Sequence, residues 1–387
     1  MPYNTSHRKG FALDYWIVVI LGILLSLGIA MSFSVGMKEV VVYGKDTWTV
    51  WRIMEHHLLR LIPGLVLFLA ALLFPVRWYR RVVLPFFGLI LVLLVAVLVQ
   101  HLVLKGASRW LQVGGFRFQP SEFAKLALIW LVAWYVSVRG RWLHLFWRGL
   151  FPVIGAIGLL VVLVGFQPNL STAGLLLMVA LGLLFLAGVS FRHFLTLGGL
   201  ALALGLVVYA IPAARQKVQQ KFAHATRRLD MFTHPERNAN LQYTYLGLSE
   251  GGLLGTGIGR SRIKIGHLSE ADTDFVFAVI GEEMGLLGMW AVLLMYLILG
   301  WRAFAIAQRL QARNKDPLLY LTAAGIGLVL LVFPLAHMGV VLGLLPPTGQ
   351  PLPFVSRGGS NLWSNLILVG ILLRLHHVAQ TGREVLP

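Results

Sequence analysis

The sequence contains no cysteine and very little charge, and these two absences narrow the class of protein before any motif is considered. Without cysteine, the chain has no disulfide, no thiolate nucleophile and no cysteine-ligated metal site. Charged residues make up 12% of the 387 residues, about half of the share that is usual in a soluble domain. Because 58% of the residues are hydrophobic, a water-soluble globule could not cover its surface. The composition indicates an integral membrane protein.

Acidic residues are especially scarce, with 15 Asp and Glu against 33 Lys and Arg and a net charge of +18. Such a balance can indicate a nucleic-acid partner. Here, however, the basic residues lie in short loops between apolar runs, which is a membrane pattern, so we expect no nucleic-acid binding. The sequence also lacks an HExxH motif, a P-loop and a Cys/His cluster.

Continuous apolar runs long enough to cross a bilayer, about 20 residues each, recur along the chain. They do not alternate between apolar and polar residues, so they are not barrel strands. The pattern predicts an all-α polytopic membrane protein with one membrane domain, 1–387, and ten transmembrane helices. The expected spans are 15–33, 58–74, 82–104, 123–138, 150–166, 173–190, 194–211, 275–300, 318–345 and 360–375.

The distribution of Lys and Arg predicts the orientation of these spans. Alternate short loops, such as 77–81 and 139–148, are basic and nearly free of acids, which marks them as cytoplasmic. Both termini then lie in the cytoplasm. The opposite side holds nearly all the carboxylates and one long extracytoplasmic loop, 212–273, between the seventh and eighth helices. Its first part, 214–232, has an apolar stripe flanked by basic residues. This pattern predicts an amphipathic helix on the membrane surface, and the alternative is an extension of the seventh span.

A carboxylate at the outer membrane surface is the first candidate for chemistry. Asp274 immediately precedes the apolar run that begins at Phe275, and Asp272 lies two residues earlier. One interpretation is a helix N-cap, because Asp and Thr accept hydrogen bonds from free helix N–H groups. The other is a reactive carboxylate beside the glycine-rich loop 251–259 and the cations that follow it. Free backbone N–H groups and cations together suit a phosphate or diphosphate.

Two further clusters lie on the same side. Ser121 is expected to cap the fourth span, and Glu122 and Lys125 are spaced to pair on one helix face, either for function or to hold the helix to a neighbour. Arg109 lies in the preceding loop. The segment 346–360 is rich in Pro and Gly, which cannot continue a helix, and predicts an irregular segment that faces a cavity.

Four separated motifs, in this order, give nearly the whole chain a specific resemblance to a known family. The chain resembles the SEDS proteins (shape, elongation, division and sporulation), whose members include FtsW and RodA. Residues 259–264 and 358–360 look more like FtsW. The motifs that carry the resemblance are 106–110 with 118–125, 167–173, 273–285 and 347–360.

The resemblance implies a peptidoglycan glycosyltransferase that polymerises lipid II, an undecaprenyl-diphosphate-linked disaccharide-pentapeptide, into β-1,4 glycan strands in division or elongation. It places the essential Asp at Asp274, as general base. No cofactor is required, and a divalent cation, Mg²⁺ or Mn²⁺, is an alternative source of positive charge at the diphosphate. The substrate-binding residues expected on this reading are Arg109, Glu122, Lys125, Arg260, Arg262, Lys264, Ser356, Gly358, Gly359 and Ser360.

The resemblance also implies that the protein lies in the bacterial cytoplasmic membrane. It implies a class B penicillin-binding protein as partner, whose single membrane helix would dock on this bundle. Other divisome or elongasome membrane proteins are further expected partners. The sequence departs from the family where Asn169 replaces an Asp and Asp272 replaces a His. The first change removes a carboxylate, and the second makes Asp272 an alternative base. A flippase for a lipid-linked diphosphate and a non-enzymatic scaffold remain the alternative functions.

Overall fold

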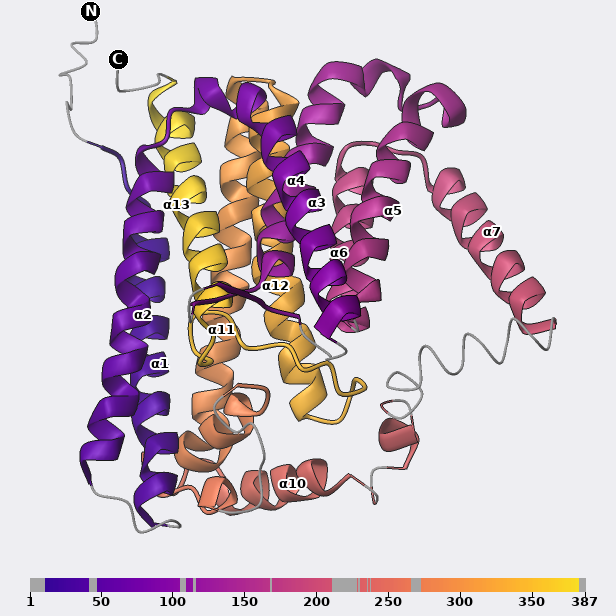
Figure 1. Ribbon diagram of the computed structural model, residues 1–387. Helices are drawn as coiled ribbons and strands as arrows, with labels where there is room; N and C mark the ends of the chain where they lie inside the picture. Colours follow the sequence, from indigo (N-terminus) through magenta and orange to yellow (C-terminus); the bar gives the residue numbers. More distant parts are fainter. Residues whose placement is uncertain are drawn as a thin grey trace, which may run out of the picture.

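In a computed structural model, the chain is described at residues 11–41, 47–104, 109–113, 116–167, 169–210, 228, 230–234, 236, 238–265 and 273–382. It is a helical bundle, as the composition predicts (Figure 1). The long helices are α1 (Tyr15–Val41), α2 (Thr47–Leu73), α3 (Tyr79–Leu104), α4 (Pro120–Arg139), α5 (Phe151–Phe166), α6 (Leu170–Leu186), α7 (Phe191–Ala210), α11 (Val276–Arg313), α12 (Pro317–Val341) and α13 (Gly359–Thr381).

Each expected span coincides with one of these helices, but several boundaries differ. Among the described residues, seven helices are long and apolar enough to cross a membrane, and α6 and the apolar part of α2, Leu58–Leu73, are shorter. The polytopic helical fold is therefore confirmed, and the count of ten crossings stays a prediction. α2 begins at Thr47, before the expected span 58–74. Its first turns contain polar residues, such as Arg52 and Glu55, which lie outside the apolar run.

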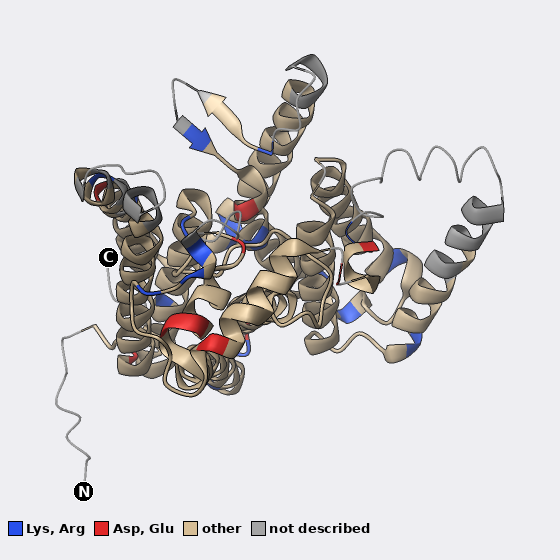
Figure 2. Cartoon of the chain, turned by 90° about the horizontal axis from the view of Figure 1, so that it is seen from below, with Lys and Arg blue, Asp and Glu red and all other residues tan. Residues whose placement is uncertain are grey.

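The interior of the bundle is formed by α4, α12 and α13, most of whose apolar side chains are buried. α4 packs against α3 and α12, and α13 packs against α2. α7 stands apart from the other long helices in both views (Figures 1 and 2). Because the central helices are covered by other helices, polar groups on them require partners within the protein.

One end of the bundle joins the first and last described segments. The start of α1 and the end of α13 lie together at the top of Figure 1, where the Ala12 N–H donates to Nδ1 of His377 over 3.0 Å. Asp14 accepts from Arg302, and Arg80 pairs with Asp316 over 3.1 Å. Among the described residues of this end, Asp14 and Asp316 are thus paired with arginines of segments that were expected to face the cytoplasm.

The opposite end carries the short elements that surround the candidate site. β1 (Leu111–Val113) and β2 (Phe116–Phe118) form an antiparallel hairpin with Leu111 opposite Phe118. α10 (Ala239–Gly251) and the one-turn helix η5 (Ile263–Ile265) follow in the long loop. Viewed from this end, acidic and basic positions lie close together near the middle of the bundle (Figure 2). The expected amphipathic helix 214–232 lies outside the described residues, except for residues 228 and 230–232.

Candidate functional site

Asp274 lies just before α11 and beside the irregular segment between α12 and α13. The N-cap residue of α11 is Phe275, which makes no side-chain capping bond, so Asp274 precedes the cap position. A Cβ atom built on Gly349 would lie 3.2 Å from Oδ2 of Asp274 and 3.6 Å from Nη2 of Arg228. The carboxylate and the guanidinium therefore approach the same glycine from different parts of the chain.

Arg228 is fixed by two hydrogen bonds. Its Nη1 donates to Oγ of Ser171 over 3.0 Å and to the carbonyl of Thr348 over 3.1 Å. Ser171 begins α6, and Thr348 belongs to the irregular segment 342–358, so one arginine of the long loop joins both. Sequence reasoning placed Arg228 only among the basic residues around the amphipathic stripe. The sequence pattern did not show that the side chain of Arg228 reaches Ser171 and Thr348.

Arg109, which was expected in the site, is electrostatically coupled to the same pair. Burial and the charge of Arg228 lower the pKa of the Arg109 guanidinium, and the charge of Asp274 acts in the opposite direction. These influences place Arg109 near both side chains. Two guanidinium groups and one carboxylate leave a net positive charge, so the cluster of Arg109, Arg228 and Asp274 suits a multiply charged anion such as a diphosphate.

The predicted ion pair between Glu122 and Lys125 is confirmed, and both side chains are buried in the bundle. Nζ of Lys125 lies 2.7 Å from Oε2 of Glu122, and the two side chains are 0% and 2% exposed. The same oxygen accepts from Nδ2 of Asn361 over 2.9 Å and from Oγ of Ser364 over 3.5 Å. The Lys125 ammonium also lies 4.3 Å from the ring centre of Phe333. The pair therefore ties α4 to α13 and α12. The expected cap by Ser121 is wrong, because α4 begins at Pro120 with Gln119 at the N-cap.

A chain of hydrogen bonds connects this region to the irregular segment. Nδ2 of Asn169 donates to Oγ of Ser121, and Oγ1 of Thr172 donates to Oδ1 of Asn169 over 2.6 Å. Nε2 of Gln350 in turn donates to Oγ1 of Thr172 over 2.7 Å. At the position where the family usually has Asp, the amide of Asn169 thus both donates and accepts. Asn169 therefore belongs to a network of neutral side chains.

The irregular segment predicted at 346–360 is confirmed over 346–358, whereas Gly359 and Ser360 already belong to α13. That it faces a cavity stays a prediction. Ser356 and Ser360 bind backbone groups near the site. Oγ of Ser356 donates to the carbonyl of Thr273 over 2.7 Å and accepts from the N–H of Leu352. Oγ of Ser360 accepts from the N–H of Gln119 over 3.0 Å. Ser356 and Ser360, predicted to bind substrate, therefore hold the residues next to Asp274 and α4. Gly358 and Gly359 form the N-terminus of α13, and their substrate role stays a prediction.

The expectation that the glycine-rich loop offers free N–H groups to a phosphate is corrected for Gly255, Thr256 and Gly257. The N–H groups of Thr256 and Gly257 donate to the carbonyls of Glu282 and Glu283 over 2.9 and 3.0 Å. The N–H of Gly255 donates to Gly251 within the loop. The loop therefore uses the N–H groups of Thr256 and Gly257 to bind α11. Composition alone did not reveal this, because the acceptors lie in a distant segment.

The cations after this loop differ from expectation as well. Lys264 is completely buried and pairs with Glu283 over 2.6 Å, so its ammonium does not face the cluster around Asp274. Burial lowers the pKa of Lys264, and the hydrogen bond and charge of Glu283 act in the opposite direction. Arg262 is exposed, and its N–H donates to Oε1 of Glu282. Arg260 is exposed beside Gly257. The described contact of Arg260 is thus within the loop and that of Arg262 is with α11, and a diphosphate role for both stays a prediction.

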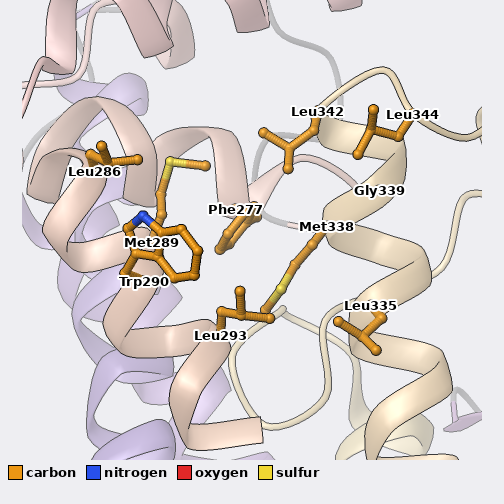
Figure 3. A pocket seen from close by; sticks show the side chains of 10 residues that line it. All are labelled: Phe277, Leu286, Met289, Trp290, Leu293, Leu335, Met338, Gly339, Leu342 and Leu344. Atoms are coloured by element: carbon orange, nitrogen blue, oxygen red, sulfur yellow. The ribbon is translucent and has the colours of Figure 1, made fainter. Parts of the chain in front are cut away.

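An apolar cavity of about 300 Å³ lies between α11 and α12, and Phe277 from the start of α11 lines it (Figure 3). Phe277, Met289, Leu293, Leu335 and Met338 are among its lining residues. Its wall is hydrophobic, so it offers no acid or base for a reaction. In the part of the chain that the structure describes, no three His, Asp or Glu side chains form a group that could hold a metal ion.

Comparisons with known proteins agree with these motifs. A family profile described as "Cell cycle protein", which covers FtsW, RodA and SpoVE, matches residues 15–381. A probable peptidoglycan glycosyltransferase FtsW from Trichlorobacter lovleyi is 33% identical over 379 residues, which are 95% of each chain. The stage V sporulation protein E of Bacillus subtilis is 34% identical over 298 residues, 76% of this chain and 77% of its own.

Solved structures extend the likeness to the fold. A chain from a peptidoglycan synthase complex superposes with a TM-score of 0.72 and 26% identity, over 96% of this chain and 100% of its own. The rod shape determining protein RodA of Thermus thermophilus superposes with a TM-score of 0.66 and 26% identity, over 96% and 99%. The match to the family profile spans nearly the whole chain, and the relatives named FtsW agree with the FtsW-like motifs. The chain therefore belongs to the FtsW, RodA and SpoVE family, the SEDS proteins.

Proposed function

We propose that this protein is a peptidoglycan glycosyltransferase that polymerises lipid II into β-1,4 glycan strands and releases undecaprenyl diphosphate. The observation that carries the proposal is the meeting of the Asp274 carboxylate and the Arg228 guanidinium at Gly349, with Arg109 coupled to both. The names of the FtsW relatives and the match to a chain of a peptidoglycan synthase complex support the same activity.

In this reaction the acceptor sugar hydroxyl attacks the anomeric carbon of the donor, and the bond from that carbon to the diphosphate oxygen breaks. Asp274 takes the proton of the hydroxyl. A general base of this kind accelerates a reaction by a factor of about 10²–10⁴. An α-linked donor that yields a β product requires attack from the face opposite the leaving group. A diphosphate leaves readily without protonation, so a single carboxylate suffices.

The departing diphosphate develops negative charge, which fixed cations stabilise. Hydrogen bonds to Ser171 and Thr348 hold Arg228 in place. Its guanidinium therefore needs to move little as negative charge develops on the diphosphate. Arg109 supplies the second guanidinium. The proposed diphosphate-binding residues therefore include Arg228, and they no longer include the buried Lys264. Mg²⁺ or Mn²⁺ stays an alternative source of positive charge, with no cofactor required.

The proposed setting is the bacterial cytoplasmic membrane, with both termini in the cytoplasm and the cluster around Asp274 on the outer side. The likeness to a chain of a peptidoglycan synthase complex supports a partner that cross-links the product. We propose a class B penicillin-binding protein in that role. Co-purification of the two tagged proteins from membranes tests the partner independently of polymerase activity.

One experiment separates the enzyme from a flippase and from a scaffold. Purified protein is incubated with lipid II in detergent, where no bilayer separates two compartments, and glycan strands are resolved by gel electrophoresis. A polymerase yields strands without any partner, whereas a flippase or a scaffold leaves lipid II unchanged. Absence of strands from protein that is folded and free of partners would contradict the proposal.

A further inference from the structure

The start of α11 folds back on the rest of the helix, and this reversal determines where Asp274 lies. Gly285 adopts φ 66° and ψ −168°, which breaks the helix. A Cβ atom on Gly281 would lie 2.9 Å from Sδ of Met289, and Phe277 shares a cavity wall with Leu293 (Figure 3). A continuous helix would separate Phe277 and Leu293 by about 24 Å. Residues 276–284 therefore run back along the next turns, and Asp274 stands at the far end of this folded-back segment.

The glycine-rich loop holds the reversal through backbone hydrogen bonds. Besides the bonds from Thr256 and Gly257, the N–H of Leu286 donates to the carbonyl of Gly252 over 2.9 Å. A Cβ atom on Gly285 would lie 2.4 Å from the nitrogen of Gly255. Only glycine fits this approach, and its positive φ also favours glycine. The loop thus satisfies backbone groups that the broken helix leaves without intrahelical partners.

A buried cluster of charges fastens the same turn to α1. Nζ of Lys264 lies 2.6 Å from both Oε1 of Glu283 and Oγ of Ser34, and Ser34 donates to the same carboxylate oxygen over 2.5 Å. The N–H of Ser261 donates to Glu283 as well, over 3.2 Å. Lys264 and Glu283 are both 0% exposed. A buried pair with these extra hydrogen bonds is geometrically specific, and removing one partner leaves a buried charge without compensation.

We propose that Glu283, through Lys264 and Ser34, is a positioning residue that fixes the folded-back segment and thereby the carboxylate of Asp274. We call these three residues the clasp. Eight residues of mostly helical chain lie between Glu283 and Asp274, and nine helical rises amount to roughly 14 Å. Glu283 therefore acts through the segment and not by touching substrate. The consequence for catalysis rests on the proposed function of Asp274, whereas the consequence for geometry does not.

The alternative is that the clasp only stabilises the fold. Glu283→Gln removes the negative charge of the carboxylate and keeps the shape of the side chain. Lys264→Met in the same chain removes the ammonium that Glu283→Gln would leave buried without its counter-ion. Glu250→Gln, on an exposed face of α10, is the matched control. The double variant also keeps the test decisive if the single variant folds poorly.

The test measures geometry and catalysis separately. Because the chain has no cysteine, cysteines introduced at Thr273 and Asn314 take spin labels at only these two sites, and pulsed spectroscopy gives their distance distribution. In unlabelled protein, kcat and KM for lipid II are measured, together with the thermal unfolding midpoint. We expect Glu283→Gln to broaden the distribution and to lower kcat by about tenfold to a hundredfold at unchanged KM. The double variant should recover part of both changes, and Glu250→Gln should change neither.

An unchanged distance distribution in folded Glu283→Gln protein would overturn the proposal. A broadened distance distribution together with a wild-type kcat would also overturn the proposal. The clasp would then hold the segment without affecting catalysis by Asp274. If the wild-type protein lacks polymerase activity, the proposed function fails, and the distance measurement alone still decides whether the clasp holds the segment.

Discussion

The guanidinium groups of Arg109 and Arg228 share one nearby carboxylate, Asp274, and this imbalance of charge is the main chemical property of the site. Like charges near each other are unfavourable without a compensating anion. A diphosphate that enters the cluster supplies that compensation, and its departure restores the imbalance. At the scale of single residues, the shape of each guanidinium therefore matters as much as its charge.

Arg228→Lys should impair polymerisation although the positive charge is kept. An ammonium cannot donate to Ser171 and Thr348 and still present a fork to phosphate. The loss of one such charged hydrogen bond, roughly 1.5–3 kcal/mol, corresponds to about tenfold or more in kcat/KM. Steady-state kinetics with lipid II measure it. Arg313→Lys is the matched control, since Nη1 of Arg313 also donates two hydrogen bonds, to the carbonyls of Ala379 and Gln380 at the other end of the bundle. Full activity of Arg228→Lys would show that Arg228 acts through its charge alone and not through specific hydrogen bonds to the diphosphate.

Glu122→Gln should cost more stability than the double change Glu122→Gln with Lys125→Met. The single change leaves the Lys125 ammonium buried beside Phe333 without its counter-ion, and breaking a buried pair costs about 3–5 kcal/mol. The double change removes both charges. Thermal unfolding in detergent compares the two variants. Equal destabilisation by the single and the double change would show that the ion pair is not the source of the loss.

At the scale of elements, the site depends on segments that are not regular helices. The irregular segment 342–358 contacts Arg228 through Thr348 and the backbone of Thr273 through Ser356. It is anchored to α11 by the hydroxyl of Tyr296, which donates to the carbonyl of Pro353. The site is thus assembled by loops that are fastened to the central helices, which is a common arrangement for functional groups.

Gly349→Ala should abolish most activity because the new methyl group would enter the gap between Asp274 and Arg228. It would lie 3.2 Å from the carboxylate oxygen, at a backbone φ of +62°. Gly188→Ala is the control, since Gly188 has φ +85° and no atom within 4 Å of the added Cβ. Both variants should lose about 1–2 kcal/mol from the left-handed backbone, but only Gly349→Ala should lose activity beyond that. Equal activity of the two variants would argue against a close approach at Gly349.

The helices and the local ion pair could be predicted from the sequence, because apolar runs and i,i+3 spacing depend on neighbouring residues. The role of the glycine-rich loop could not. Free N–H groups suggested an anion site, but their acceptors, Glu282 and Glu283, lie beyond the loop on a broken helix. Lys264 contacts Ser34, 230 positions away, and Arg228 contacts Thr348, 120 positions away. Such long-range pairings are set by the packing of the bundle, which one sequence does not reveal.

At the scale of the whole molecule, charge and shape give the bundle two different ends. The end that joins α1 and α13 pairs its acids with arginines, as Asp14 does with Arg302 and Asp316 with Arg80. The other end gathers the cluster around Asp274, the clasp and α10. A reaction on the outer surface of a membrane needs this second end to face away from the cytoplasm.

Cysteine labelling in cells tests this orientation directly. Leu254→Cys lies in the glycine-rich loop at a side chain that is 79% exposed, and Asn314→Cys lies in the exposed turn between α11 and α12. Because the natural chain has no cysteine, an impermeant maleimide should label Leu254→Cys in intact cells and Asn314→Cys only after permeabilisation. The reverse pattern would place the cluster around Asp274 in the cytoplasm.

The most direct measurement is lipid II polymerisation by purified Asp274→Asn protein. The amide keeps the size of the side chain beside Gly349 but cannot take the proton of the acceptor hydroxyl, so the rate should fall by about 10²–10⁴-fold. Asp230→Asn, which removes an exposed carboxylate paired with His234, should polymerise like the wild type. Folding is checked by the unfolding midpoint of each variant. Glycan strands formed by Asp274→Asn at a near wild-type rate would contradict the assignment of Asp274 as the base.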